Sequence, residues 1–137
     1  MCEGGRLSAR VTTETTAFPI LIVEDDEPTQ KLLRAVLLRC GYSSDVASNG
    51  RQAIALLQTK QYAAVVLDLM MPEVGGQDVV AFLGGTASPT PVIICSAAGP
   101  AALRGFDPNV VRAIVRKPFD IDEIVAVVAS VTGGTSG

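Results

Sequence analysis

The sequence predicts an α/β fold in which a five-stranded parallel sheet is doubly wound, with helices on both faces. Short apolar runs at residues 20–23, 63–67, 91–95 and 110–115 are typical of strands that are buried on both faces, and residues 43–47 form a weaker candidate. Segments with apolar residues at helical spacing separate these runs. Regular alternation of strands and helices favours a parallel sheet with right-handed crossovers.

Capping residues indicate where the helices begin and end. Asp26 can cap a first helix that has Pro28 in its first turn and ends at Gly41, and Asn49 followed by Gln52 indicates the start of a second helix. The apolar residues that mark the helix faces are Leu32, Leu33, Val36, Leu37 and Cys40, then Ala53, Ile54, Leu56 and Leu57, then Val79, Val80, Phe82 and Leu83, and finally Ile121, Ile124, Val125, Val127 and Val128.

A length of 137 residues corresponds to one domain, and a hydrophobic content of 48% is enough to build a core. The Gly-, Ser- and Thr-rich residues 1–18 predict a flexible N-terminal arm, residues 19–132 the folded domain, and residues 133–137 a flexible tail. We therefore expect this sequence to contain no output domain in addition to the folded one.

Composition argues against several classes of function. A net charge of −3 disfavours non-specific nucleic-acid binding by this domain. No apolar run approaches the roughly 18 residues needed to span a membrane. The first residues lack a basic stretch followed by an apolar one, so we expect no signal peptide and a cytoplasmic location. The chain has no histidine and three widely spaced cysteines, which disfavours a zinc site and Ser–His or Cys–His nucleophiles.

Polar side chains follow four of the predicted strands at the point where each strand ends. They are Glu24 with Asp25, Asp68, Ser96 and Lys117. The carboxyl ends of parallel strands meet at one edge of a sheet, where ligands bind. Carboxylates gathered there repel one another, and a hard cation such as Mg2+ relieves that repulsion. Such a site suits phosphoryl transfer to a carboxylate, with lysine and hydroxyl groups contacting the phosphoryl oxygens.

Four segments in this order resemble receiver domains of two-component response regulators. They are Val23-Glu24-Asp25-Asp26-Glu27-Pro28, Leu67-Asp68-Leu69-Met70-Met71-Pro72 with Gly75-Gly76, Ser96-Ala97, and Lys117-Pro118-Phe119. The resemblance covers roughly residues 19–132 and implies a flavodoxin-like (βα)5 fold. It also implies a signalling switch that catalyses only its own phosphorylation and dephosphorylation, rather than an enzyme acting on other substrates.

The resemblance also implies roles for individual residues. Asp68 would accept a phosphoryl group from a sensor histidine kinase or a histidine phosphotransfer protein, and the phosphorylated domain would act on an unidentified downstream target. Asp25 would bind Mg2+ directly and Glu24 through water, while Asp68 and the backbone carbonyl of Met70 would be further ligands. Ser96 and Lys117 would contact the phosphoryl group.

Two departures from the family pattern are present, and the first of them leaves an alternative open. Ile114 stands three residues before the lysine, where the family usually has Tyr or Phe, and the Gly- and Pro-containing residues 97–109 predict only a short fourth helix. A degenerate receiver that binds partners without phosphorylation is therefore the alternative, although the acidic pair, Asp68, Ser96 and Lys117 are all present.

A phosphatase of the haloacid dehalogenase type is disfavoured because Met70 stands where that class has its acid/base aspartate. A nucleotide-binding fold is disfavoured because no Gly-rich loop follows the first strand.

Overall fold

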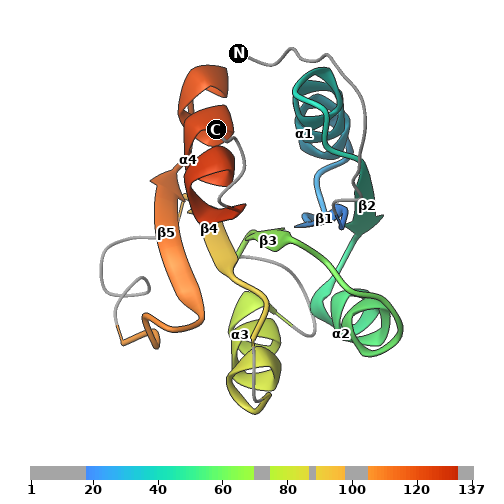
Figure 1. The fold of residues 1–137 in the computed structure, drawn as a ribbon, viewed down its shortest axis with the longest axis vertical. Coiled ribbons are helices and arrows are strands. Elements are labelled where there is room, and N and C mark those ends of the chain that lie inside the picture. The colour runs from blue at the N-terminus through green and yellow to red at the C-terminus, as the bar shows by residue number, and fades with distance from the viewer. Residues whose placement is uncertain (1–17, 70–74, 87–88, 98–104, 133–137) are drawn as a thin grey trace.

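Five parallel strands form one sheet at the centre of the structure, and helices lie on both of its faces (Figure 1). The computed structural model describes residues 18–69, 75–86, 89–97 and 105–132. The strands are β1 (Ile20–Val23), β2 (Ser44–Ala47), β3 (Ala64–Leu67), β4 (Val92–Ser96) and β5 (Val111–Arg116). The helices in the described ranges are α1 (Glu27–Arg39), α2 (Gly50–Thr59), α3 (Gly76–Gly84) and α4 (Ile121–Thr132).

The strand order is β2-β1-β3-β4-β5, and every neighbouring pair is parallel. This arrangement confirms the predicted five-stranded, doubly wound sheet. The chain moves from β1 to β2 on one side and then crosses to β3 on the other side. The direction of winding thus reverses between β1 and β3, which is where open α/β sheets place a ligand-binding crevice.

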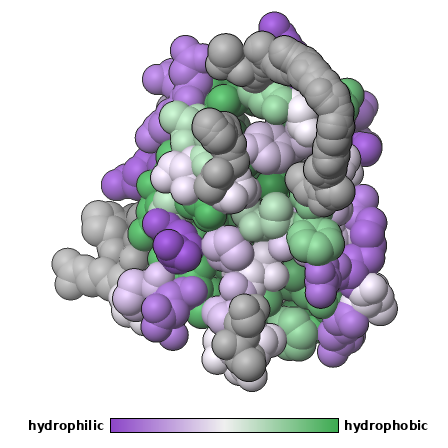
Figure 2. All heavy atoms as spheres, in the orientation of Figure 1, coloured by the Kyte–Doolittle hydropathy of each residue, from purple (hydrophilic) through white to green (hydrophobic). Residues whose placement is uncertain are grey.

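The two faces of the sheet bury separate sets of side chains. Leu21, Val65 and Ile94 belong to the apolar cluster that packs under α2 and α3. Their strand neighbours Ile22 and Val66 point the other way, into the cluster under α1 and α4. All residues of β1 and β3 are buried, as continuous apolar strands in a covered parallel sheet should be. In the orientation of Figure 1, hydrophilic residues lie mainly along the outer margins of the surface and apolar residues show between them (Figure 2).

The predicted helix caps are present. The backbone N–H of Thr29 donates to Oδ2 of Asp26 (3.1 Å) at the start of α1, and the backbone N–H of Gln52 donates to Oδ1 of Asn49 (2.9 Å) at the start of α2. Gly41 follows the end of α1 with a φ of +90°, a conformation that glycine adopts without steric cost. Local sequence signals therefore set both ends of α1 and the start of α2.

Some predicted details differ from the structure or lie outside it. Leu32 and Ile121 are 42% and 48% exposed, because only the residues on the narrow stripe facing the sheet are buried, such as Leu33 in α1 and Ile124 in α4. The division into an arm, a folded domain and a tail remains a prediction, since residues 1–17 and 133–137 lie outside the described residues. Residues 98–104, most of the predicted fourth helix, also lie outside them.

Substitution of Asn49 tests whether its side chain caps and stabilises α2. We expect Asn49→Ala to lower the free energy of unfolding by about 1 kcal/mol, because the N–H of Gln52 loses its acceptor. Urea denaturation measures this change. Asn49→Ser is the matched control, since a serine oxygen can accept the same hydrogen bond. Equal stability of the alanine and serine variants would contradict the assigned cap.

Candidate functional site

Backbone hydrogen bonds bring the polar strand ends to one edge of the sheet. The N–H of Glu24 donates to the carbonyl of Ala47, and the N–H of Asp68 donates to the carbonyl of Val23, each at 3.0 Å. The N–H of Lys117 donates to the carbonyl of Ser96, also at 3.0 Å. The strand ladders thus continue past the ends of β1, β3 and β5. The predicted residues from four strands consequently share one edge.

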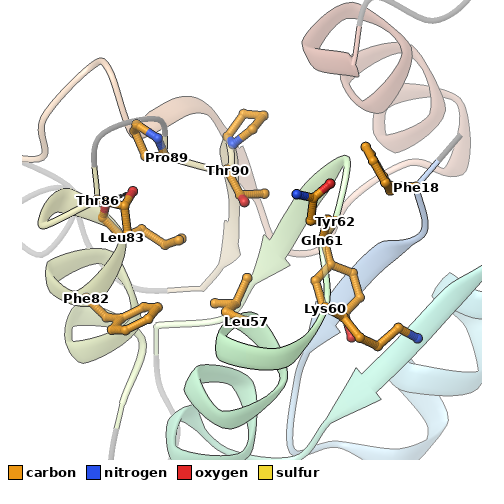
Figure 3. Close-up of a pocket in the computed structure, with 11 residues that line it drawn as sticks. Phe18, Leu57, Lys60, Gln61, Tyr62, Phe82, Leu83, Thr86, Pro89 and Thr90 are labelled. Atoms are coloured by element: carbon orange, nitrogen blue, oxygen red, sulfur yellow. Dashed lines mark hydrogen bonds between the residues drawn. The ribbon is translucent and has the colours of Figure 1, made fainter.

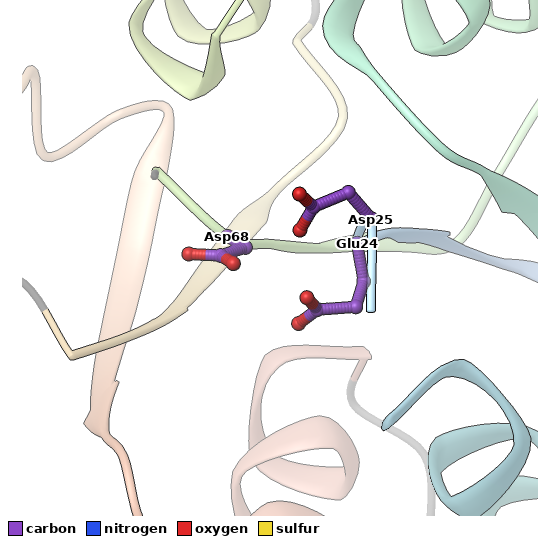
Figure 4. A group of neighbouring side chains, drawn as sticks. All are labelled: Glu24, Asp25 and Asp68. Atoms are coloured by element: carbon purple, nitrogen blue, oxygen red, sulfur yellow. The ribbon is translucent and has the colours of Figure 1, made fainter. Parts of the chain in front are cut away.

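Three carboxylates gather at this edge. Glu24, Asp25 and Asp68 each offer an oxygen, and these oxygens all lie within 4.8 Å of one another. The side chains of Glu24 and Asp25 extend from the end of β1 toward β3, where Asp68 lies (Figure 4). Glu24 and Asp68 are 3% and 7% exposed, whereas Asp25 is open to solvent. The donor set consists of hard oxygen ligands with one side accessible, which fits a Mg2+ ion that retains several waters.

Lys117 joins two of these carboxylates. Its Nζ lies 2.6 Å from Oε1 of Glu24 and 3.4 Å from Oδ2 of Asp68. The other carboxylate oxygen of Glu24 accepts a hydrogen bond from the backbone N–H of Asp26 (3.1 Å). Both oxygens of Glu24 are therefore bound by the protein, which suits contact with a cation through water more than direct ligation.

Burial and neighbouring charges act in opposite directions on the pKa values of Glu24 and Lys117. Burial raises the pKa of Glu24 above its usual value, although hydrogen bonds from Lys117 and Asp26 oppose the rise. Burial alone would lower the pKa of Lys117, but the hydrogen bond to Glu24 and the charge of Asp68 raise it overall. Lys117 consequently keeps its positive charge at neutral pH and can attract an anionic group at this edge.

Ser96 is the last residue of β4 and is fully buried. It pairs with Arg116 of β5, one residue before Lys117, so its backbone lies at the same edge as the carboxylates. Cys95 precedes it in the core, where burial raises the pKa of the thiol to about 12. This thiol stays protonated and packs as an apolar group.

Met70 lies outside the described residues.

Two residues at the site had no role in the sequence-based prediction. A Cβ atom on Gly76 would lie 2.8 Å from the carbonyl oxygen of Asp68 and from Cα of Leu69, so only glycine permits this approach of α3. Gln30 donates a hydrogen bond to the carbonyl of Glu24. Gly76 stood within a recognised segment, whereas no sequence pattern marked Gln30.

A separate cavity of about 460 Å3 lies at the opposite end of the sheet (Figure 3). Tyr62, which precedes β3, and Pro91, which precedes β4, line it together with Leu57 and Phe82. None of the described residues that line it carries a carboxylate. This cavity is therefore not part of the acidic site.

Comparison with known proteins agrees with this geometry. The family model described as "Response regulator receiver domain" matches residues 20–129. The chain is 35% identical over 126 residues to the transcriptional regulatory protein TcrA of Mycobacterium tuberculosis, covering 90% of this chain and 49% of that protein. It is 37% identical over 109 residues to the uncharacterized transcriptional regulatory protein YkoG of Bacillus subtilis, covering 78% and 47%. The chain thus spans about half the length of the curated relatives it matches.

Solved structures show the same fold. The receiver domain of the Francisella response regulator 1452 superposes with a TM-score of 0.75 at 27% identity, covering 87% of this chain and 99% of that one. The receiver domain of the sensor histidine kinase PA1611 from Pseudomonas aeruginosa, whose structure contains a magnesium ion in the active site cleft, superposes with a TM-score of 0.76 at 22% identity, covering 87% and 100%. With a family match over most of its length and relatives above 30% identity, this chain belongs to the receiver domains of two-component response regulators.

Proposed function

We propose that this receiver domain accepts a phosphoryl group on Asp68 in a Mg2+-dependent reaction and thereby changes its interactions with partners. The observation that carries the proposal is the position of Lys117, whose Nζ lies beside Asp68 in a cluster that also contains Glu24 and Asp25. One carboxylate as acceptor, two more for a cation and one ammonium group match the needs of phosphoryl transfer, which are positioning and charge neutralisation.

Each residue of the cluster has a role in this proposal. Asp68 is held by its backbone bond to Val23 and provides the attacking oxygen. Asp25, exposed at the edge, would hold the ion together with Asp68 and the backbone carbonyl of Met70, while Glu24 would act through water. When bound, Mg2+ would neutralise negative charge on the phosphoryl oxygens. Lys117 would bind one phosphoryl oxygen and the buried hydroxyl of Ser96 another.

The donor in this proposal is the phosphohistidine of a sensor histidine kinase or a histidine phosphotransfer protein. A bond forms between an Asp68 oxygen and phosphorus as the phosphorus–nitrogen bond breaks, and the electron pair returns to the imidazole of the donor. The domain would act as a switch without turning over a separate substrate. TcrA and YkoG are both named as transcriptional regulatory proteins, so we propose a downstream protein target in the same kind of pathway.

None of the helices in the described part of the chain combines the length and apolar character needed to cross a lipid bilayer. We propose a cytoplasmic location, where the donor histidine proteins of such pathways act, and no direct role for this domain in binding nucleic acid.

A phosphorylation-independent interaction module is the second candidate. Ile114, which is 42% exposed on β5, favours it because no aromatic ring stands there to follow the hydroxyl of Ser96. The acidic cluster and its lysine favour the first candidate. The two proposals differ in whether the protein gains a phosphoryl group.

Phosphorylation of Asp68 is the first expectation. Incubation with acetyl phosphate and Mg2+ should add the mass of one phosphoryl group, measured on the intact protein, and Asp68→Asn should abolish the addition. Asp120→Asn, an exposed acid outside the cluster, should still be labelled. Equal labelling of the Asp68 variant would show that another residue is the acceptor, and no labelling of the wild type would favour the second candidate.

Stabilisation by Mg2+ is the next expectation. Binding to the folded state raises stability by mass action, by about 2.7 kcal/mol at a concentration 100 times the dissociation constant. The melting temperature should therefore rise by several degrees with Mg2+, and much less in Asp25→Ala. Asp122→Ala, an exposed acid on α4, should respond like the wild type. A melting temperature that does not change when millimolar Mg2+ is added would argue against an ion at this edge.

The switch itself should depend little on β5. Ile114 is β-branched and has no ring, so it cannot move a large surface between two positions. We expect beryllium fluoride with Mg2+, a stable mimic of the phosphoryl group, to increase protection from hydrogen exchange in residues 97–109 and to change residues 110–116 little. A large change centred on Ile114, or none in 97–109, would contradict this expectation.

A further inference from the structure

The side chain of Gln30 links α1 to the acidic end of β1. Its Nε2 donates to the backbone carbonyl of Glu24 (2.5 Å) and lies 3.4 Å from Oγ of Ser48 in the segment between β2 and α2. The backbone N–H of Gln30 donates to the carbonyl of Asp26 (3.0 Å), so the residue is also anchored at the start of the helix. Three segments of the chain therefore meet at one half-buried amide group.

We propose that Gln30 is a positioning residue for the cation site: it holds the turn between Glu24 and Asp25 so that Asp25 faces the ion. The inference rests on the function proposed above, because it concerns binding of a divalent cation by the same carboxylates. Gln30 contacts the backbone that carries these ligands and not the ion itself.

The Glu24 carbonyl needs a partner because the strand ends there. The N–H of Glu24 makes the last ladder bond of β1, to the carbonyl of Ala47, after which the chain turns toward α1. A backbone carbonyl that leaves a buried strand must find another donor. The amide of Gln30 supplies it, so the orientation of the peptide between Glu24 and Asp25 is fixed from the helix side.

Fixing that peptide fixes the direction of Asp25. The side chain of Glu24 is already held at both oxygens, by Lys117 and by the N–H of Asp26. Asp25 is exposed, so packing does not hold it in place. The hydrogen bond from Gln30 is thus a third constraint on the turn. It sets the plane of the peptide between Glu24 and Asp25. Partners that orient ligands in this way affect metal affinity without contacting the metal.

Removal of the donor tests the proposal. Gln30→Met keeps a side chain of similar length and a residue that favours helix, but has no N–H to donate. We expect its dissociation constant for Mg2+, measured by isothermal titration calorimetry, to be about tenfold weaker than that of the wild type. Gln58→Met makes the same chemical change at an exposed position of α2 and should leave the constant unchanged.

Urea denaturation in the presence of EDTA separates this role from a general loss of stability. Without Mg2+, we expect Gln30→Met to unfold at a somewhat lower urea concentration than Gln58→Met, because the carbonyl of Glu24 loses its donor. Both variants should be fully folded in the absence of urea, where only the Gln30 variant loses Mg2+ affinity. Gln30→Ala removes the same donor with a smaller side chain and should show the same loss, so that the result does not depend on how methionine packs.

Wild-type affinity for Mg2+ in both Gln30 variants would overturn the inference and leave the proposed function intact. An equal loss in Gln58→Met would also overturn it, because the hydrogen bond would not be the cause. A wild-type protein that binds no Mg2+ at all would instead refute the cation site in the proposed function, and the inference would fall with it.

Discussion

Charge compensation at the carboxyl edge of the sheet is the constraint on which the rest of this structure depends. Glu24, Asp25 and Asp68 carry three negative charges when ionised, and the ammonium group of Lys117, which contacts Glu24 and Asp68, balances only one of them. Two of the carboxylates are buried, where such an imbalance is costly. In the function proposed above, a divalent cation would supply the missing positive charge. With such an ion bound, this edge of the sheet would no longer repel a negatively charged phosphoryl group.

Burial of apolar strands and the hydrogen bonds between them bring those charges together. The core residues of β1 and β3 are buried on both faces, and the ladder between them ends with Asp68 bonded to Val23 beside Glu24. On the other side of Asp68, the absence of a side chain on Gly76 lets α3 approach the backbone of Asp68 and Leu69. The backbone of Asp68, the proposed phosphoryl acceptor, is therefore held by contacts from two directions.

The sequence predicted the sheet, the helix caps and the shared edge of the polar residues because those features follow from local patterns. Apolar runs indicated the strands, Asp26 and Asn49 indicated helix starts, and parallel pairing brought the strand ends together. The sequence did not predict that Lys117 forms ion pairs with both Glu24 and Asp68. It also did not predict the hydrogen bond from Gln30 to the carbonyl of Glu24. Those depend on side-chain directions across segments far apart in the chain. The exposure of Leu32 was missed because periodicity gives a helix face only to within one neighbouring residue.

A crystal structure of the protein soaked in Mn2+, an anomalous scatterer with ligand preferences like those of Mg2+, would show whether a divalent cation binds at the carboxyl edge of the sheet. We expect one anomalous peak at this edge, from an ion bound by carboxylate oxygens of Asp25 and Asp68 at about 2.0–2.2 Å, with Lys117 still beside Asp68. Full occupancy of a Mn2+ site elsewhere, with the carboxylates of Asp25 and Asp68 free of the ion, would contradict this expectation.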